Sequence, residues 1–191
     1  MNQLLPGNGL IRKLWIGETA AYRDHLLRLD RDSRHRRFSG AISDDVIARH
    51  AATADGIDVV VHGFFVDGML RGAAELRRTG SLFAREGEAA FSVEQPWQSH
   101  GVGPELLERT LLSARNRGIK LLRMDCLADN QRMQQLARKF DAEFKFEFGN
   151  VTGEVDAPRS TPLSLMREAF ADSYSIASAI CDAQSRLFKP A

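Results

Sequence analysis

One segment constrains the fold more than any other: a strand-like stretch that runs through a glycine-containing loop into a helix. Residues 88–94 read E-A-A-F-S-V-E, and residues 98–103 read Q-S-H-G-V-G. Residues 104–117 then carry proline at their first position and are followed by Gly118, as helices commonly are. Amides at the start of a helix lack partners inside it and carry partial positive charge. The segment therefore predicts an anion-binding site.

Taken alone, this loop leaves several interpretations open. No lysine follows the glycines, so the pattern does not indicate a Walker-type nucleotide site. A third glycine at the dinucleotide-binding offset is also missing. A tight strand–helix turn without any ligand, or an unrelated nucleotide-binding α/β protein, would fit the same residues.

Hydrophobic periodicity predicts the remaining elements. Strands are expected at residues 12–18, 57–65, 69–77, 120–127, 143–149 and 151–156. Helices are expected at residues 19–29, from 43, from 129 and from 161, and the polar, basic residues 31–40 are interpreted as a solvated connector. Asp67-Gly68 between two strand-like runs predicts a hairpin. The order β-α-α-β-β-β-α-β-α-β-β-α predicts an α/β (α+β) fold with a mixed sheet flanked by helices.

Size and charge narrow the class of protein. The chain has 191 residues, which is enough for one domain with a substantial core, and its formal net charge is +1. We therefore expect neither a nucleic acid nor a membrane as partner. Cys126 and Cys181 follow no metal or redox spacing, so we expect no metal. Without a signal-peptide pattern, buried free thiols in a reducing cytoplasmic compartment are the expectation.

The residues around the glycine loop carry a family resemblance. Phe91-Ser92-Val93 followed by Q-x-x-G-x-G resembles the acetyl-CoA signature of the GNAT N-acetyltransferase superfamily. Downstream, N-x-x-M-x-x-L-A from Asn130 resembles the second motif of the same family. Ser33 to Phe38 is similar to an S-x-x-x-R-F stretch of bacterial protein-lysine acetyltransferases. The resemblance covers roughly residues 10–157.

This resemblance implies a fold and a co-substrate. It implies a mixed, mostly antiparallel central sheet with helices on both faces, and two neighbouring strands that splay to form an acyl-CoA cleft. Acetyl-CoA would lie there, with its pantetheine paired to the splayed strand and its pyrophosphate on the loop amides. The implied cofactor-binding residues are Phe91, Ser92, Val93, Gln98, Ser99, His100, Gly101, Val102, Gly103 and Asn130.

The resemblance also implies an N-acyltransferase that transfers acetyl directly to a primary amine, either a protein lysine or a small amine. A carboxylate facing the cleft would act as general base. Glu88 is the first candidate, Glu75 the second and Glu94 the third. Many relatives place a tyrosine acid for the thiolate where this chain has Ala137. A catalytically weak acyl-CoA-binding sensor or interaction module of the same fold is the alternative.

The C-terminal part extends beyond the resemblance. We expect an acetyltransferase domain at residues 1–158 and a helical extension at residues 159–191. Its apolar stripe must be buried, either on its own domain or in a homodimer. The stripe consists of Leu165, Met166, Ala169, Phe170, Tyr174, Ala177, Ile180 and Cys181.

Overall fold

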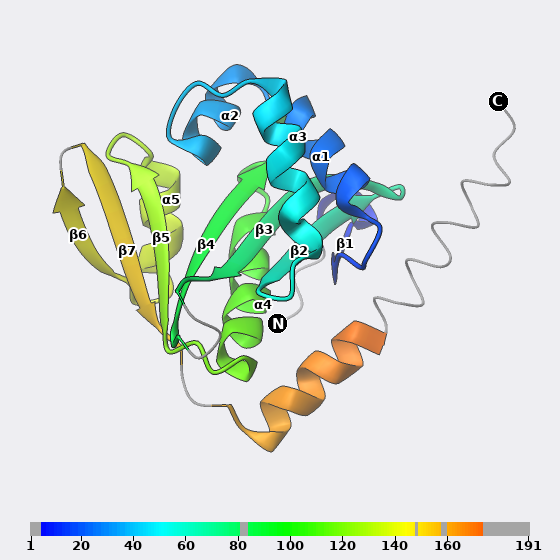
Figure 1. Cartoon of the computed structure of the whole chain (residues 1–191), viewed down its shortest axis with the longest axis vertical. Helices are drawn as coiled ribbons and strands as arrows, with labels where there is room; N and C mark the ends of the chain where they lie inside the picture. The colour runs from blue at the N-terminus through cyan, green and yellow to red at the C-terminus, as the bar shows by residue number, and fades with distance from the viewer. Residues whose placement is uncertain (1–4, 81–83, 148, 158–159, 174–191) are drawn as a thin grey trace, which may run out of the picture.

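A single seven-stranded sheet organises the chain (Figure 1). The computed structural model describes residues 5–80, 84–147, 149–157 and 160–173. The strand order is β1-β2-β3-β4-β5-β7-β6, and every neighbouring pair is antiparallel except β4 and β5. The predicted mixed, mostly antiparallel sheet is thus confirmed. The strands are β1 (Leu10–Lys13), β2 (Val59–Val66), β3 (Met69–Arg78), β4 (Glu86–Val93), β5 (Leu121–Leu127), β6 (Glu143–Glu147) and β7 (Asn150–Asp156).

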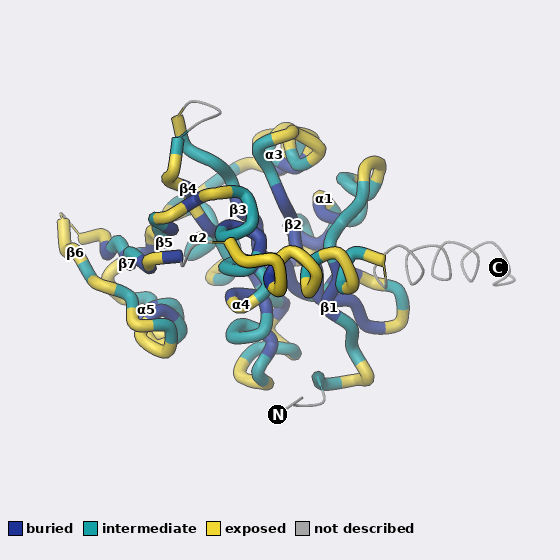
Figure 2. The backbone as a smooth tube through the Cα atoms, turned by 90° about the horizontal axis from the view of Figure 1, so that it is seen from below, coloured by how far each residue is buried: buried dark blue, intermediate teal, exposed yellow. Residues whose placement is uncertain are grey.

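Helices cover both faces of this sheet, as Figures 1 and 2 show. Val60 and Val61 of β2 point to opposite faces because side chains alternate along a strand. Val61 packs under the helices α1 and α3, whereas Val60 packs under α4 and α5. The described helices of the domain are α1 (Thr19–Arg28), α2 (Arg31–Phe38), α3 (Asp44–Ala52), α4 (Val102–Asn116) and α5 (Gln131–Arg138).

The β2–β3 hairpin follows the Asp67-Gly68 prediction. Both turn residues have positive φ, 51° at Asp67 and 71° at Gly68, as a type I′ turn requires. The hairpin sets β3 beside β4, where Ala73 lies opposite Ser92. This pairing fixes which side chains of β4 share a face with those of β3.

The parallel strands β4 and β5 separate soon after they meet. Their pairing covers only Glu86 to Glu88 of β4, with Leu121 to Arg123 of β5. Both strands then continue without a common ladder, β4 to Val93 and β5 to Leu127. The predicted splayed strand pair is therefore present, and the backbone of β4 beyond Glu88 has no strand partner on the β5 side.

Two sequence-based boundaries were wrong near the N-terminus. Residues 31–38 form the helix α2 rather than a connector, because the Asp30 carboxylate caps it by accepting from the Ser33 amide at 2.9 Å. The first strand ends at Lys13 and does not reach Glu18. Glu18 instead turns back onto the buried guanidinium of Arg12, with N···O distances of 2.7 Å.

The final helix, described at residues 162–173, meets the domain through polar side chains. Glu168 accepts hydrogen bonds from Ser113 at 2.7 Å and Asn116 at 2.6 Å on α4. The predicted apolar stripe was expected to be buried, but Leu165, Met166 and Phe170 are 50%, 55% and 70% exposed (Figure 2). These three side chains are therefore not buried on their own domain, because the polar side of the helix faces α4, and burial in a homodimer stays a prediction. The later members of the stripe, from residue 174 on, lie outside the described residues.

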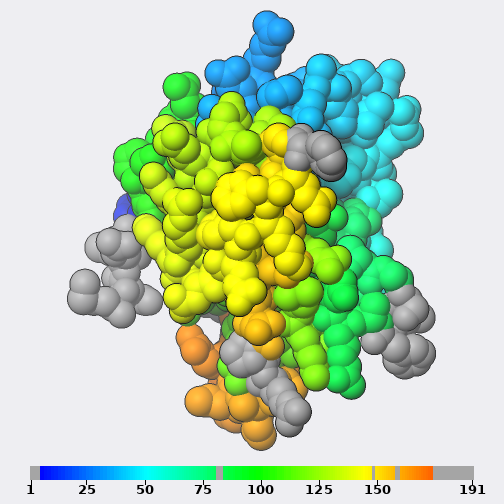
Figure 3. Space-filling view, turned by 90° about the vertical axis from the view of Figure 1, so that its left-hand side faces the viewer, coloured from blue at the N-terminus to red at the C-terminus, as the bar shows by residue number. Residues whose placement is uncertain are grey.

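The face beyond β5 is formed by a continuous part of the chain. In Figure 3, residues of β5, α5, β6 and β7 make up most of the visible surface, with α2 and α3 above and the final helix below. The gap between β4 and β5 separates this part from the N-terminal helices in Figure 1.

Candidate functional site

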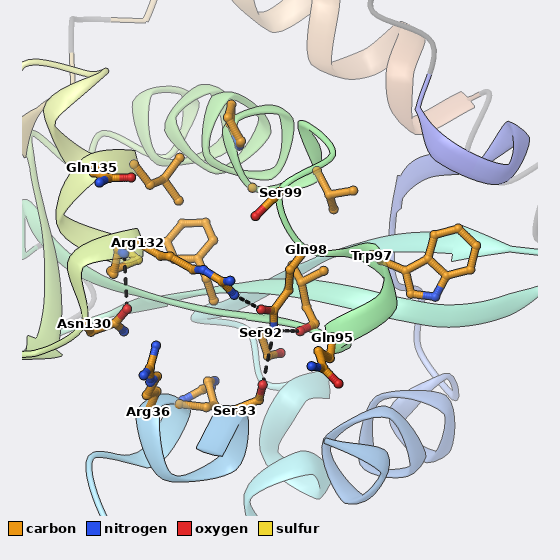
Figure 4. A pocket seen from close by; sticks show the side chains of 18 of the residues that line it. Ser33, Arg36, Ser92, Gln95, Trp97, Gln98, Ser99, Asn130, Arg132 and Gln135 are labelled. Carbon is orange, nitrogen blue, oxygen red and sulfur yellow. Dashed lines mark hydrogen bonds between the residues drawn. The ribbon is translucent and has the colours of Figure 1, made fainter. Parts of the chain in front are cut away.

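A cavity of about 810 Å³ lies along the gap between β4 and β5. Side chains of α2, β4, the glycine loop, the start of α4 and α5 line it (Figure 4). All the residues expected to bind the cofactor line this cavity except His100. The His100 ring is exposed, and its Nδ1 lies 2.6 Å from the carbonyl oxygen of Gln98 in its own loop.

The glycine loop presents a run of free amides to this cavity. The chain turns through positive φ at Ser99 (63°) and Gly101 (84°), and α4 begins at Val102 rather than at the predicted Pro104. Within the described residues, the amides from Ser99 to Gly103 donate to no backbone or side-chain acceptor. Successive free amides at a helix N-terminus form a concave anion-binding surface.

Neither packing within the protein nor backbone conformation requires a glycine at position 103. An added Cβ would lie 3.5 Å from the Leu136 side chain, which is ordinary van der Waals contact. Gly103 lines the cavity, so the missing Cβ leaves room for a ligand to approach the backbone. Gly101 differs, because its positive φ favours glycine for conformational reasons.

The backbone of β4 offers a second set of ligand contacts. The Glu94 amide donates to the Arg71 carbonyl of the neighbouring chain segment at 2.9 Å. Alternation along the strand therefore turns the amides of Phe91 and Val93 away from β3 and toward the gap. The Val93 carbonyl already accepts from the Gln98 side chain at 2.8 Å. Phe91 is thus the residue whose backbone is free to pair with an extended ligand.

Gln98 connects three parts of the cavity wall. Its Nε2 also donates to Ser33 Oγ on α2 at 3.2 Å, and its Oε1 accepts from Arg132 on α5 (Figure 4). Arg132, Arg36 and Lys139 all line the cavity and give it positive charge suited to phosphate groups. Sequence reasoning missed these cations because it interpreted residues 31–40 as a connector and considered only Asn130 at the start of α5.

Asn130 has a structural role that the structure shows directly. Its side-chain oxygen accepts from the Met133 amide at 3.2 Å and so caps α5. The residue also lines the cavity, and Figure 4 shows it near Arg36. Ala137, where relatives carry a tyrosine, is 2% exposed and belongs to the core cluster under the sheet. It does not line the cavity.

The candidate bases differ sharply in their surroundings. Glu88 is exposed at the last position of β4 that pairs with β5, and its carboxylate makes no hydrogen bond or ion pair with a described residue, although the charge of Arg37 acts on it. Glu75 is buried, and its carboxylate accepts from Tyr22, Arg37, His50 and Arg77 at 2.6–3.1 Å. Burial alone would raise the pKa of Glu75, but the His50 hydrogen bond and the Arg37 charge together hold that pKa below its usual range.

The carboxylate of Glu94 is also engaged in hydrogen bonds and ion pairs. It accepts from Arg28 at 3.0 Å and Arg71 at 2.9 Å, and it lies 3.3 Å from His25 Nδ1.

Cys126 is buried on β5, and burial raises the pKa of its thiol, so it is a poor nucleophile. Within the described ranges, no His, Cys, Asp and Glu side chains cluster with metal-site geometry. None of the described helices has the length and apolarity needed to cross a membrane.

Comparisons with known proteins agree with this geometry. The family model for the acetyltransferase (GNAT) family matches residues 10–142. No curated protein sequence matches the chain. Among solved structures, the GNAT domain of S. lividans PAT aligns with a TM-score of 0.68 and 25% identity, covering 76% of this chain and 89% of that chain.

Two further structures share the fold at lower identity. The yncA protein from Salmonella typhimurium, solved with its cofactor acetyl-CoA, aligns at TM-score 0.62 and 17% identity over 81% of this chain and 96% of its own. The cAMP-binding acyltransferase from Mycobacterium smegmatis aligns at TM-score 0.60 and 21% identity, over 93% of this chain but only 54% of its own. This chain therefore spans about half of that mycobacterial protein. With more than half of its length matched by the family model, the chain belongs to the acetyltransferase (GNAT) family of acyl-CoA-dependent acyltransferases.

Proposed function

We propose that this protein transfers an acetyl group from acetyl-CoA to a primary amine, on a protein lysine or a small molecule. The observation that carries the proposal is the run of free amides from Ser99 to Gly103 at the mouth of the β4–β5 gap. The pyrophosphate of CoA would accept from these amides, and Arg36, Arg132 and Lys139 would neutralise its phosphates. The pantetheine would pair with the free backbone of Phe91.

Glu88 is the proposed general base. An attacking amine must be neutral, so a proton acceptor near it speeds the reaction. Glu88 is free to take a proton, whereas the Glu75 carboxylate is saturated by donors. Glu88 lies at the closed end of the splay, so we expect it to act through a water molecule. Direct attack then places the amine and the thioester in one cleft without a covalent intermediate.

The leaving thiolate needs no dedicated acid. A thiol has an ordinary pKa of about 8.5, so its thiolate is a tolerable leaving group in water. No tyrosine is among the residues that line the cavity in the described part of the chain. We therefore propose that solvent protonates the CoA thiolate.

Calorimetry with acetyl-CoA, followed by thiol detection across an amine library and lysine peptides, tests this function. We expect micromolar binding and acceptor-dependent thiol release. The Glu88→Gln variant should lower turnover on the order of 10²- to 10⁴-fold while acetyl-CoA binding persists. Glu86→Gln is the matched control, because Glu86 is an exposed carboxylate on the same face of β4. Absence of CoA binding at millimolar ligand would refute the proposal.

The acyl-CoA sensor is the second candidate, favoured by the burial of Ala137 and by the lack of a tyrosine among the described residues that line the cavity. It predicts acetyl-CoA binding with the same affinity but no thiol release above background with any amine. Binding and thiol release are measured on the same sample, so the two functions are separated by one experiment.

Self-association through the final helix stays a prediction. Met166 and Phe170 form an exposed apolar surface with Leu163, which is 67% exposed. Sedimentation equilibrium should show a dimer that the double variant Met166→Ser/Phe170→Ser converts to a monomer with unchanged acetyl-CoA binding. A wild-type protein that is monomeric at every concentration measured would contradict this prediction.

A further inference from the structure

A serine, a histidine and a carboxylate are aligned beside the cavity. Ser92 Oγ lies 2.9 Å from His25 Nε2, and His25 Nδ1 lies 3.3 Å from Glu94 Oε1. Ser92 and Glu94 are two residues apart on β4 and therefore share a face, and His25 reaches them from α1. This is the arrangement of nucleophile, base and orienting acid found in serine hydrolases.

The three groups have the protonation states that such an arrangement needs. Burial lowers the pKa of His25, so its imidazole is neutral at neutral pH. Burial would raise the pKa of Glu94, but hydrogen bonds from His25 and Arg71 and the charge of Arg28 hold that pKa below its usual range. The ionised Glu94 accepts from Nδ1–H, which leaves Nε2 as the acceptor for the Ser92 hydroxyl.

The surroundings favour a chemical role over a purely structural one. Ser92 is 7% exposed and lines the cavity, whereas His25 is fully buried behind it. The hydroxyl is therefore the only member of the three at the cavity wall. Ser92 is flanked by Phe91 and Val93, whose amides point into the β4–β5 gap. A thioester paired along this strand would lie beside the Ser92 hydroxyl, with a free amide nearby for its oxyanion.

We infer that Ser92 is an acyl-accepting nucleophile, and that this protein hydrolyses acyl-CoA thioesters through an acyl-Ser92 ester when no amine is bound. This second activity rests on the acyl-CoA site of the proposed function, but not on Glu88 or on amine transfer. Glu88 and Ser92 are separated by about 13 Å along β4, because a strand rises about 3.3 Å per residue. The two residues therefore serve different nucleophiles, an incoming amine and the serine itself.

The steps balance without any further reagent. Ser92 Oγ forms a C–O bond to the thioester carbon while its proton passes to His25 Nε2. The C–S bond then breaks, and the CoA thiolate takes this proton from His25. Water next attacks the serine ester, gives its proton to His25, and expels the Ser92 alkoxide, which takes that proton back. Acyl-CoA and water thus become a carboxylic acid and free CoA.

Intact-protein mass spectrometry with acetyl-CoA and no amine tests the inference. We expect one added acetyl group, localised to Ser92 by peptide fragmentation, together with slow thiol release. Ser92→Ala should lose both signals, while the exposed Ser43→Ala control keeps them. His25→Gln should slow hydrolysis on the order of 10²- to 10⁴-fold, because the serine loses its base. Thermal unfolding and acetyl-CoA calorimetry on each variant show whether the fold and the cavity persist.

A fluorophosphonate probe gives a readout that does not depend on CoA. It should label Ser92 in the native wild-type protein, but not in heat-denatured protein or in His25→Gln. Comparison with Glu88→Gln separates the two activities, since that variant should lose amine transfer and keep acyl-Ser92. Acetyl-CoA binding and amine transfer without any Ser92 adduct or probe labelling would overturn the inference and leave the proposed function standing. Absence of acetyl-CoA binding would instead overturn the proposed function, while probe labelling would still report on the serine.

Discussion

Acid should destabilise this protein through His62, a buried histidine on β2. Ser113 donates its hydroxyl proton to Glu168 at 2.7 Å, so it can only accept from His62 Nε2, which lies 2.9 Å away. The ring is then a neutral Nε2–H tautomer whose buried Nδ1 has no partner among the described residues. A proton added at Nδ1 would have no acceptor. Burial, opposed by the Glu168 charge and aided by those of Lys13, Arg109 and Arg117, lowers the pKa of His62 from 6.5 to about 3.

The size of the effect follows from these two pKa values. The folded state binds a proton at His62 more weakly than the unfolded state, so stability is full above pH 6.5 and is lost as the pH falls toward 3. Between about pH 7 and about pH 4.5, the loss from this one residue amounts to about 2.5 kcal/mol. His25, whose pKa is also lowered by burial, contributes in the same direction.

Urea unfolding of wild type and His62→Gln at several pH values isolates the contribution of His62. Glutamine keeps a donor for Ser113 but does not titrate, so the difference between the two proteins cancels all other titrating groups. We expect the wild type to lose about 2.5 kcal/mol relative to the variant between about pH 7 and about pH 4.5. Parallel stability curves for the two proteins would refute the reasoning.

Three other substitutions probe separate parts of the structure. Gly101→Ala places a side chain at a φ of 84°, so it should lower the free energy of unfolding by about 1–2 kcal/mol and weaken acetyl-CoA binding in calorimetry. The control Gly118→Ala, at a φ of 72° outside the cavity, should lower stability by the same amount and leave binding unchanged. Asp30→Ala removes the cap of α2 and should lower the free energy of unfolding by about 1 kcal/mol in urea, whereas Asp30→Asn should restore most of it. Glu168→Ala leaves donors of α4 unpaired and should lower stability by about 1–3 kcal/mol in thermal unfolding. It should also make the final helix easier to cleave in limited proteolysis, and an unchanged cleavage rate would contradict the polar docking of that helix.

Periodicity and turn chemistry predicted most of the fold because they act locally. The Asp67-Gly68 turn and the alternating strands carry their own signals, and the order of elements then leaves few arrangements. Helix α2 was missed because its stability comes from the Asp30 cap and from contacts at the cavity rather than from an apolar stripe. The sequence did not show which side of the final helix faces its own domain, because an apolar stripe does not reveal competing polar contacts, and Glu168 makes three of them.

The part of the candidate site that consists of backbone amides could be predicted from the sequence. The glycine loop and the strand before it specify amides, and these follow directly from the sequence pattern. The roles of side chains depend on residues brought together from distant parts of the chain. The sequence could not distinguish Glu75 from Glu88 as the base, because Tyr22, Arg37 and His50 meet Glu75 only in the folded structure. His25 carried no sequence signal at all, because its partners are more than sixty residues away.

Amide chemical shifts during titration test the central claim most directly, namely that CoA binds with its pyrophosphate on the loop amides. In two-dimensional ¹⁵N–¹H spectra, acetyl-CoA should move the amide signals of Ser99, Gly101 and Gly103 most strongly, together with that of Phe91. Pantetheine, which lacks the pyrophosphate, should move the signal of Phe91 but leave the three loop signals in place. Loop signals that do not respond to saturating acetyl-CoA, or a largest response outside the β4–β5 gap, would contradict the account.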